Sequence, residues 1–202
     1  RLCNTTNAEG RTGDIAEAMR GADVCIAMSR PGPGVIKKEW VKAMAKDAIV
    51  FSCANPVPEI WPWEAKEAGA RIVATGRSDF PNQVNNSMCF PAIFRGALDV
   101  WAKTITDEMC IASANELAKF AQEKGLHEDY IVPNMDDWEA FPREAAAVAM
   151  KAQEQGVARI KISREAELKQ ASAIIKRSRD LIADLMKAGH IPPPPVEKAS
   201  KK

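Results

Sequence analysis

The run ADVCIAM, residues 22–28, is the stretch that decides the fold, and two similar runs follow it: AIVFSC at 48–53 and RIVAT at 71–75. All three are short, rich in valine, isoleucine or both, and bounded by turn residues, which is typical of strands buried on both faces. Their starting points lie about 25 residues apart, which is the repeat of a β-α-β unit. Such units give parallel strands joined by right-handed crossovers. The sequence therefore predicts an α/β fold built on half of a doubly wound parallel sheet.

Helical patterns fill the segments between these runs and dominate the rest of the chain. One precedes the first run, two lie between the runs, and four follow Asn86, after which strand signals cease: Asp14–Arg20, Lys37–Lys46, Pro62–Ala68, Pro91–Lys103, Asp107–Lys124, Ala140–Gln155 and Glu165–Lys187. Gly21 and Gly69 come directly after two of them, where a C-terminal cap favours a positive φ. The last helix has one apolar face, so we expect it to pack on this domain or on a partner subunit.

These patterns divide the chain into three parts. We predict a sheet domain over residues 1–103, an α-helical segment over residues 104–189 and a tail rich in proline and lysine over residues 190–202. We expect the tail to be extended and mobile, because its proline run favours polyproline geometry and chain ends are seldom tied down.

Composition excludes several classes of protein. Apolar residues make up 46% and charged residues 27%, and 28 Lys+Arg balance 27 Asp+Glu, which argues against disorder and against a polybasic nucleic-acid binder. No apolar run approaches the roughly 18 residues that span a bilayer, and the first residues lack a signal-peptide pattern. We therefore expect a cytoplasmic protein that binds neither membrane nor nucleic acid.

The cysteines and histidines offer little for catalysis or metal binding. The five cysteines are widely spaced and mostly have apolar neighbours, which indicates reduced structural thiols: Cys3, Cys25, Cys53, Cys89 and Cys110. Only two histidines occur, His127 and His190, so a histidine triad or a histidine-rich metal site is nearly excluded. We predict no metal ligands within this chain.

An open parallel sheet binds its ligands at the carboxyl ends of the strands, and we expect three loops to converge there. They are Ser29–Gly34, Ala54–Glu59 and Gly76–Asn86. Two of these loops carry asparagines, whose carboxamides offer a donor and an acceptor in one plane without a charge to be desolvated. Asn85 and Asn86 also stand at the start of a helix, where free N–H groups favour an anion such as a carboxylate.

Each of these features has a purely structural alternative. Asn85 can serve only as a helix cap, and Asn55 only as the first residue of an Asn-Pro turn. Arg77 and Asp79 are close enough in sequence to pair with each other, which we favour over contact between Arg77 and a ligand carboxylate. Arg30 can help to hold an anion or be a solvated loop arginine.

Parts of a complete dinucleotide-binding enzyme are missing from the sequence. No G-x-G-x-x-G turn follows the first run, and no charged residue about 20 positions further on is placed to select the cofactor. The segment Pro31–Gly34 is no substitute, since its prolines lack the N–H groups that hold phosphate. The three loops contain no lysine and the only tyrosine, Tyr130, lies in a separate linker, so we assign no catalytic residue.

Four strings are specific enough, in their order and spacing, to indicate a family: ADVCIAMSRPG, IVFSCANPVPEI, ATGRSDFPNQVNN and FPAIFRGALDV. This stretch resembles the NAD-binding domain of bacterial and archaeal malic enzymes, and the likeness continues more loosely to about residue 160. It implies that residues 1–103 are the second half of a Rossmann-like NAD(P)-binding domain, followed by the family's C-terminal helical segment. Malic enzymes oxidise (S)-malate with NAD or NADP and then decarboxylate the bound oxaloacetate to pyruvate and CO2, using a divalent metal, Mg or Mn.

The resemblance also implies roles for four residues. Asn55 is expected to contact both the nicotinamide riboside and malate, Asn85 the nicotinamide, and Asn86 a malate carboxylate. Ser29 lies where the family's strand-end loop passes near the cofactor. The family's tyrosine acid, lysine base, acidic metal ligands and glycine-rich turn are expected upstream of Arg1.

Two functional hypotheses follow. In the first, the chain is part of a malic enzyme and supplies nicotinamide and malate contacts, either within a homodimer or completed by an upstream segment. In the second, it is a catalytically inert fragment that binds a nucleotide or dicarboxylate, or only pairs with another subunit. The sequence leaves the choice between NAD and NADP, the metal and the oligomeric state open.

Overall fold

The computed structural model describes residues 5–193, which form two compact units. The first contains the described residues up to Phe90 together with Ala114–Asp137, and the second contains Pro91–Ser113 together with the described residues from Trp138 onward. The boundary predicted between residues 103 and 104 stays a prediction. Cys3 and positions 194–202 of the predicted tail lie outside the described residues.

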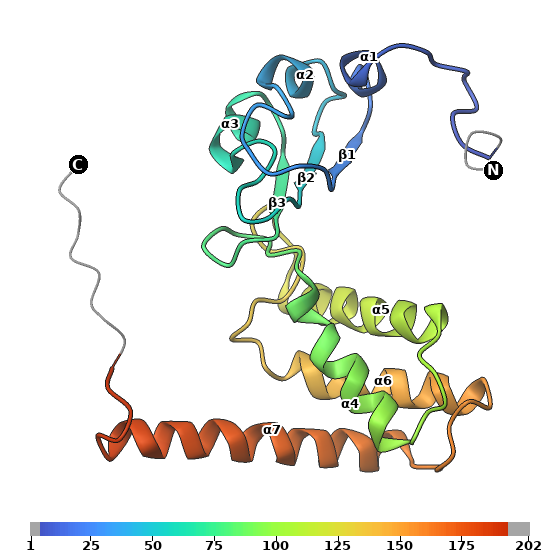
Figure 1. The fold of residues 1–202 in the computed structure, drawn as a ribbon, viewed down its shortest axis with the longest axis vertical. Helices are drawn as coiled ribbons and strands as arrows, with labels where there is room; N and C mark the ends of the chain where they lie inside the picture. Colours follow the sequence, from blue (N-terminus) through green and yellow to red (C-terminus); the bar gives the residue numbers. More distant parts are fainter. Residues whose placement is uncertain (1–4, 194–202) are drawn as a thin grey trace. The chain divides into compact units, whose positions relative to one another are not determined.

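A three-stranded parallel sheet forms the centre of the first unit (Figure 1). Its strands are β1, Val24–Ala27; β2, Ile49–Ser52; and β3, Ile72–Thr75, in the spatial order β1-β2-β3. The first residues of the three strands are paired, so the strands begin and end level with one another. The predicted α/β fold with a Rossmann-like half sheet is confirmed.

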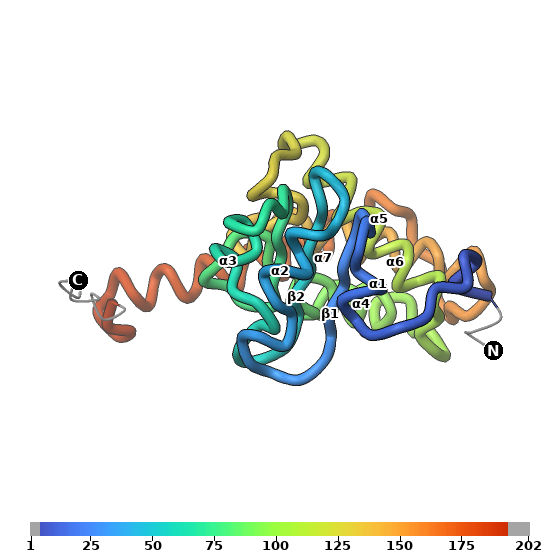
Figure 2. The backbone as a smooth tube through the Cα atoms, turned by 90° about the horizontal axis from the view of Figure 1, so that it is seen from above, coloured from blue at the N-terminus to red at the C-terminus, as the bar shows by residue number. Residues whose placement is uncertain are grey.

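Three short helices accompany the strands: α1, Ile15–Met19; α2, Lys38–Lys42; and α3, Pro62–Glu67. The chain passes from β1 through α2 to β2, and from β2 through α3 to β3, as Figure 2 traces along the backbone. Gly21 and Gly69 have the predicted positive φ, 70° and 104°. Both angles let the chain leave a helix at once, because a glycine carries no Cβ to oppose them.

The second helix is shorter than the sequence predicts. Its pattern indicated a helix over Lys37–Lys46, but α2 ends at Lys42. The N–H of Ala45 bonds instead to the carbonyl of Ala22, just before β1, at 3.0 Å. That prediction was wrong because a hydrogen bond between distant segments, which leaves no local signal in the sequence, takes the place of the last helical turn.

An apolar core joins one face of the sheet to the three helices. It draws residues from the three strands, from α1, α2 and α3, and from the segments between them: Met19, Ala27, Ile36, Val41, Met44, Ala48, Val50, Ile60, Ala65, Ala70 and Val73. Val50, on the middle strand, has no exposed surface. This packing fixes the strand ends, and therefore the starting points of the loops that follow them.

The opposite face of β1 is open in the described part of the chain. Val24 is 48% exposed and Ile26 is 58% exposed, whereas Ala27 is buried. Alternate residues of a strand point to opposite faces, so β1 presents an apolar row on one side. Burial on both faces was therefore a wrong prediction for this strand. An edge strand with an apolar row is a surface that proteins ordinarily cover.

Four longer helices follow the sheet: α4, Phe90–Asp99; α5, Asp107–Lys124; α6, Ala140–Glu154; and α7, Arg164–Lys187. A single 3-10 turn, η2, Asn86–Met88, precedes them. The bounds predicted for α5 are confirmed, and those of α6 and α7 differ by one residue. In the second unit α6 packs along α7, and the alanines of α6 allow that close approach.

The helix predicted over Pro91–Lys103 ends earlier, at Asp99. Trp101 has a φ of 50°, which a helix cannot continue. The N–H of Lys103 then bonds to the carbonyl of Val157 at 2.9 Å, so the end of α4 is tied to the segment that follows α6. As in α2, a contact distant in sequence sets the end of the helix.

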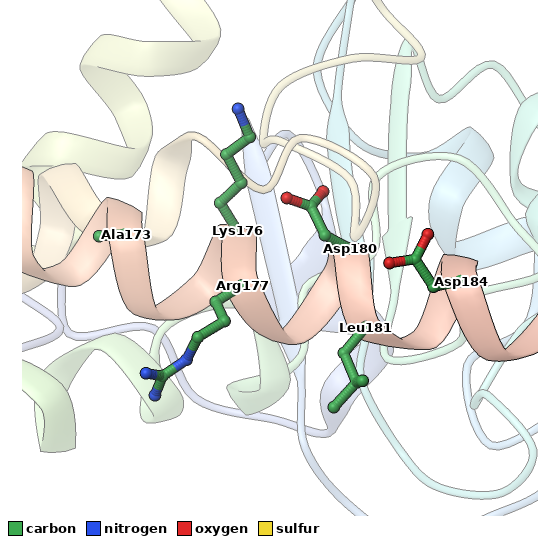
Figure 3. A pocket seen from close by; sticks show the side chains of 6 residues that line it. All are labelled: Ala173, Lys176, Arg177, Asp180, Leu181 and Asp184. Carbon is green, nitrogen blue, oxygen red and sulfur yellow. The ribbon is translucent and has the colours of Figure 1, made fainter.

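The N-terminal part of α7 is packed and its C-terminal part is exposed. Glu167 and Ala171 are buried, whereas Leu181 and Ile182 are 58% and 53% exposed. Within its unit the helix continues beyond α4 and α6 as one unbroken rod (Figures 1 and 2). Figure 3 shows Asp180 on the opposite side of this exposed part from Leu181. None of the described helices has both the length and the apolar character needed to cross a membrane.

Candidate functional site at the ends of the strands

Three loops leave the carboxyl ends of the strands, and they hold all the residues predicted for the site. Ser29 follows β1, Asn55 follows β2, and the loop after β3 begins at Gly76 and ends at η2. Because the strands are parallel and in register, these loops start at one edge of the sheet.

Asn55 and Asn85 come together at Gly76. A Cβ built on Gly76 would lie 3.3 Å from Oδ1 and 3.4 Å from Nδ2 of Asn55, so the absence of a side chain makes room for this carboxamide. Nδ2 of Asn85 donates to the carbonyl of Gly76 at 2.8 Å. Two of the predicted site residues therefore lie against Gly76, and a side chain there would press on the carboxamide of Asn55.

Asn86 differs from its neighbour Asn85. The Oδ1 of Asn85 accepts a hydrogen bond from the N–H of Ser87 at 2.9 Å, so Asn85 does cap η2. The side chain of Asn86 is exposed and makes no hydrogen bond to any of residues 5–193. Both the oxygen and the nitrogen of the Asn86 carboxamide are therefore available to a ligand. In the preceding residue, Asn85, both groups are already hydrogen-bonded within the fold.

Ser29 is tied to Glu59, a residue that the sequence analysis left without a role. The N–H and the Oγ of Ser29 donate to Oε1 of Glu59 at 2.7 and 3.1 Å. The other oxygen, Oε2, accepts from the N–H of Ala54 at 3.1 Å, and Glu59 has no exposed surface. The Ser29 hydroxyl has therefore used its only hydrogen, and it can face a cofactor only as an acceptor.

Glu59 was missed because its context gives a weak signal. The charge stands at the end of a proline-containing turn and is followed by Ile60 and Trp61, so the local sequence is apolar. The same local sequence is equally compatible with an exposed glutamate in a turn. Only the tertiary structure shows that the side chain points inward to the amides of two different loops.

Arg77 and Asp79 form the predicted ion pair. Nε and Nη2 of Arg77 donate to the two oxygens of Asp79 at 2.8 and 2.7 Å, and Nη1 donates to the carbonyl of Pro56 at 2.8 Å. The hydrogen bond from the guanidinium holds the pKa of the Asp79 carboxyl below its usual range. The guanidinium also lies over the Trp61 ring. Arg77 therefore shapes the loop, as predicted.

The thiols beside Glu59, those of Cys25 and Cys53, have raised pKa values. Burial raises the pKa of Cys25 and of Cys53, and the negative charge of Glu59 raises both further. The thiolate is the nucleophilic form, so these groups are poor nucleophiles. All the cysteines in the described residues are free of disulfide bonds.

Tyr130 is committed to a structural contact. Its hydroxyl donates to Oδ2 of Asp137 at 2.8 Å, and burial together with this bond raises the pKa of Tyr130. Asp137 is bound by Lys124 as well. Among residues 5–193 no three histidine, cysteine, aspartate or glutamate side chains are grouped so that they could hold a metal ion.

Known proteins match most of this chain. The family model described as "Malic enzyme, NAD binding domain" matches residues 7–154. The bifunctional malic/malolactic enzyme of Bacillus subtilis is 49% identical over 160 residues, which cover 79% of this chain and 38% of that protein. The NADP-dependent malic enzyme of Halomonas elongata is 42% identical, over 72% of this chain and 37% of its own length.

Solved structures agree with this match. The crystal structure of Entamoeba histolytica malic enzyme is 52% identical with a TM-score of 0.90, covering 93% of this chain and 39% of that one. That of the malic enzyme from Pyrococcus horikoshii Ot3 is 51% identical with a TM-score of 0.82, covering 90% and 42%. The chain thus spans about two fifths of the length of these relatives.

Proposed function

The chain belongs to the malic enzyme family, and from that premise we propose that it takes part in the oxidative decarboxylation of (S)-malate to pyruvate and CO2 with NAD or NADP. The observation that carries this proposal is the meeting of Asn55 and Asn85 at Gly76, at the strand ends where such sheets bind ligands. Two neutral carboxamides at one point suit an amide-bearing ring and ribose hydroxyls, because they donate and accept without adding charge.

Each proposed site residue has a separate task. Asn55 orients the nicotinamide riboside and malate, and Asn85 holds the nicotinamide side of the site through Gly76. Asn86 donates from its uncommitted carboxamide to a malate carboxylate. Ser29 accepts from the cofactor, since its hydroxyl hydrogen already goes to Glu59. When bound, NAD(P) supplies the acceptor for the hydride that leaves malate.

The described residues fit only part of the cofactor. The carboxamides suit its nicotinamide end, but the glycine-rich turn that would hold its phosphates is absent from the sequence. A metal does not fit them, because residues 5–193 offer no ligand group, so no step here depends on one. We propose that phosphate binding, the base and the Mg or Mn ligands come from an upstream segment. The open apolar face of β1 supports such a completing partner.

Malate-dependent reduction of NAD and of NADP, measured with Mn²⁺ present and with the intact mass taken from the same sample, tests the proposal. We expect no turnover from the 202-residue chain alone. Turnover should appear when the chain is joined to the preceding part of a malic enzyme, such as that of Bacillus subtilis. Activity at the mass of one isolated chain would contradict the need for completion.

A specific observation also favours the inert alternative. Tyr130 is committed to Asp137, so its hydroxyl is not available as an acid, and no metal-ligand group is present among residues 5–193. If the joined polypeptide bound NADH but never turned over malate, the chain would be a binding or subunit-pairing module. If it neither bound nor turned over, the proposed site itself would be wrong.

A further inference from the structure

Glu59 is a buried charge without a cationic partner in the described structure. Its exposed fraction is 0%, and no lysine or arginine among residues 5–193 forms an ion pair with it. A buried carboxylate costs several kcal/mol in desolvation unless hydrogen bonds satisfy it. Hydrogen-bond donors must therefore stabilise this one, and where they come from shows what the side chain does.

The donors come from two loops that are distant in sequence. Oε1 accepts from the N–H and Oγ of Ser29, after β1, and Oε2 accepts from the N–H of Ala54, after β2. Ala54 immediately precedes Asn55. One carboxylate thus spans the starts of both loops and uses each oxygen for one of them.

Backbone hydrogen bonds already join the remainder of the two loops. The N–H of Gly32 donates to the carbonyl of Val57 at 3.2 Å, and that of Ile36 to the carbonyl of Glu59 at 3.1 Å. These bonds do not involve the Glu59 side chain. Its carboxylate therefore fixes only the part of each loop nearest the strand ends, where Ser29 and Asn55 lie.

We propose that Glu59 is a positioning residue. It holds the backbone at Ser29 and Ala54, and so fixes the positions of Ser29 and Asn55 at the place where the nicotinamide end of the cofactor binds. The effect on cofactor binding rests on the proposed function. The positioning of the two loops by Glu59 does not depend on it. Glu59 acts through its two loop partners and does not itself touch the cofactor.

Glu59→Gln is the sharpest variant, because it keeps the shape and changes one acceptor into a donor. If the amide oxygen accepts from Ser29, the NH2 group faces the N–H of Ala54. If the amide is turned round, the N–H of Ser29 loses its acceptor. In either orientation one loop is released. Glu39→Gln, at an exposed position on α2, is the matched control.

The first readout is backbone amide exchange followed by NMR on the 202-residue chain. We expect exchange at Ser29 or Ala54 to accelerate at least about tenfold in Glu59→Gln, since one lost hydrogen bond corresponds to a change of that size. Exchange at Val50 should stay unchanged, which shows that the core is intact. Unchanged exchange at both loop amides in the folded variant overturns the proposal.

The second readout is the dissociation constant of the joined polypeptide for NADH and NADPH, measured by titration. We expect it to rise about tenfold in Glu59→Gln and to stay unchanged in Glu39→Gln. Unchanged affinity in a variant with a released loop overturns the cofactor part. If the joined parent polypeptide binds neither dinucleotide, the proposed function fails, while amide exchange on the 202-residue chain still decides the positioning.

A third readout reports the charge itself. Removing the Glu59 carboxylate should lower the pKa of Cys25 and Cys53, so that both are alkylated by iodoacetamide faster at a given pH. Should Glu59→Gln fail to fold, Ser29→Ala carries the exchange test, because it removes one hydrogen bond to Glu59 and leaves the carboxylate in place. Alkylation rates equal to those of the parent would show that no charge lies beside these thiols, and would overturn the proposal.

Discussion

The asparagines of the strand-end loops differ in how much of each carboxamide the fold already uses. Asn85 accepts from Ser87 with its oxygen and donates to Gly76 with its nitrogen. Asn86 uses neither group among the described residues. A ligand that contacts Asn86 forms a new hydrogen bond to a free carboxamide. A ligand that contacts Asn85 must share a group that is already bonded to Gly76 or Ser87. Asn86 is therefore the residue whose loss should affect binding with the least effect on folding.

We predict that Asn86→Ala raises the KM for malate strongly and that Asn55→Ala weakens the use of both malate and cofactor. Losing one hydrogen bond to a carboxylate costs about 1.5–3 kcal/mol, which is about 10- to 150-fold in kcat/KM. Steady-state kinetics of the joined, active polypeptide would measure this. Values within twofold of the parent for both variants would contradict the assigned roles.

Gly76→Ala should disturb the site without unfolding the chain. The added Cβ would stand 3.3 Å from Oδ1 of Asn55, so the carboxamide must move by a few tenths of an ångström. The φ of Gly76 suits alanine, so no backbone strain is added. We expect a dissociation constant for NADH raised by about tenfold. An unchanged constant would show that the position of Asn55 does not matter to the cofactor.

At the scale of the helices, α4 and α6 approach each other so closely that only glycine fits. A Cβ on Gly96 would lie 2.3 Å from the carbonyl oxygen of Ala145 and 2.9 Å from Cβ of Val148. Alanine gains about 1 kcal/mol of helix propensity over glycine, but a clash with backbone costs more, because the helices must separate.

We therefore predict that Gly96→Ala lowers the free energy of unfolding by about 1–3 kcal/mol. Urea denaturation followed by circular dichroism would measure it. The control is Ala118→Leu on the exposed side of α5, which should change stability by less than about 0.5 kcal/mol. A Gly96→Ala variant more stable than the parent would contradict the close approach.

The contact between α4 and α7 contains a carboxyl that responds to pH. Glu167 is fully buried beside Asp99, which Arg95 binds at 2.7 Å through Nε. Burial first, and then the charge of Asp99, raise the pKa of Glu167 to about 7, and Arg95 opposes this in part. No described residue donates to either oxygen of Glu167. In its protonated form the carboxyl can itself donate to Asp99.

Stability should therefore fall as the pH rises. The pKa of Glu167 is higher in the folded chain, so its contribution is fully present below about 4.5 and is lost as the pH passes about 7. We expect Tm to drop between pH 5 and 8, and Glu167→Gln to remove most of that drop, since a carboxamide donates without ionising. Asp180→Asn, on the exposed part of α7, is the control. An equal drop in Glu167→Gln would contradict this assignment.

Whole-molecule features follow the sequence where they depend on local signals and depart from it where they depend on distant contacts. The strand runs and the glycine caps predicted the sheet and its order along the chain, because burial and φ requirements act within a few residues. The ends of α2 and α4 were missed, since bonds from Ala45 to Ala22 and from Lys103 to Val157 set them. Glu59 escaped notice for the same reason.

The exposed apolar face of α4 bears on the proposed homodimer. Leu98 is 60% exposed, and Phe94, one turn before it, is 41% exposed. We predict that the chain self-associates, and that Leu98→Asp shifts it to monomers by placing a charge on this face. Light scattering across a hundredfold range of concentration would measure the mass. A parent chain that stays monomeric throughout would contradict the homodimer and favour an upstream segment as the partner.

The first unit is discontinuous, because Ala114–Asp137 returns to it after Pro91–Ser113 has left. Asn82 holds that return: its Nδ2 donates to the carbonyl of Glu128 at 2.7 Å, and its Oδ1 accepts from the N–H of Ile131 at 2.9 Å. A ribosome delivers the sheet well before these partners. The first unit therefore cannot be completed during synthesis until Asp137 has left the exit tunnel, and until then the Asn82 carboxamide lacks its partners at Glu128 and Ile131.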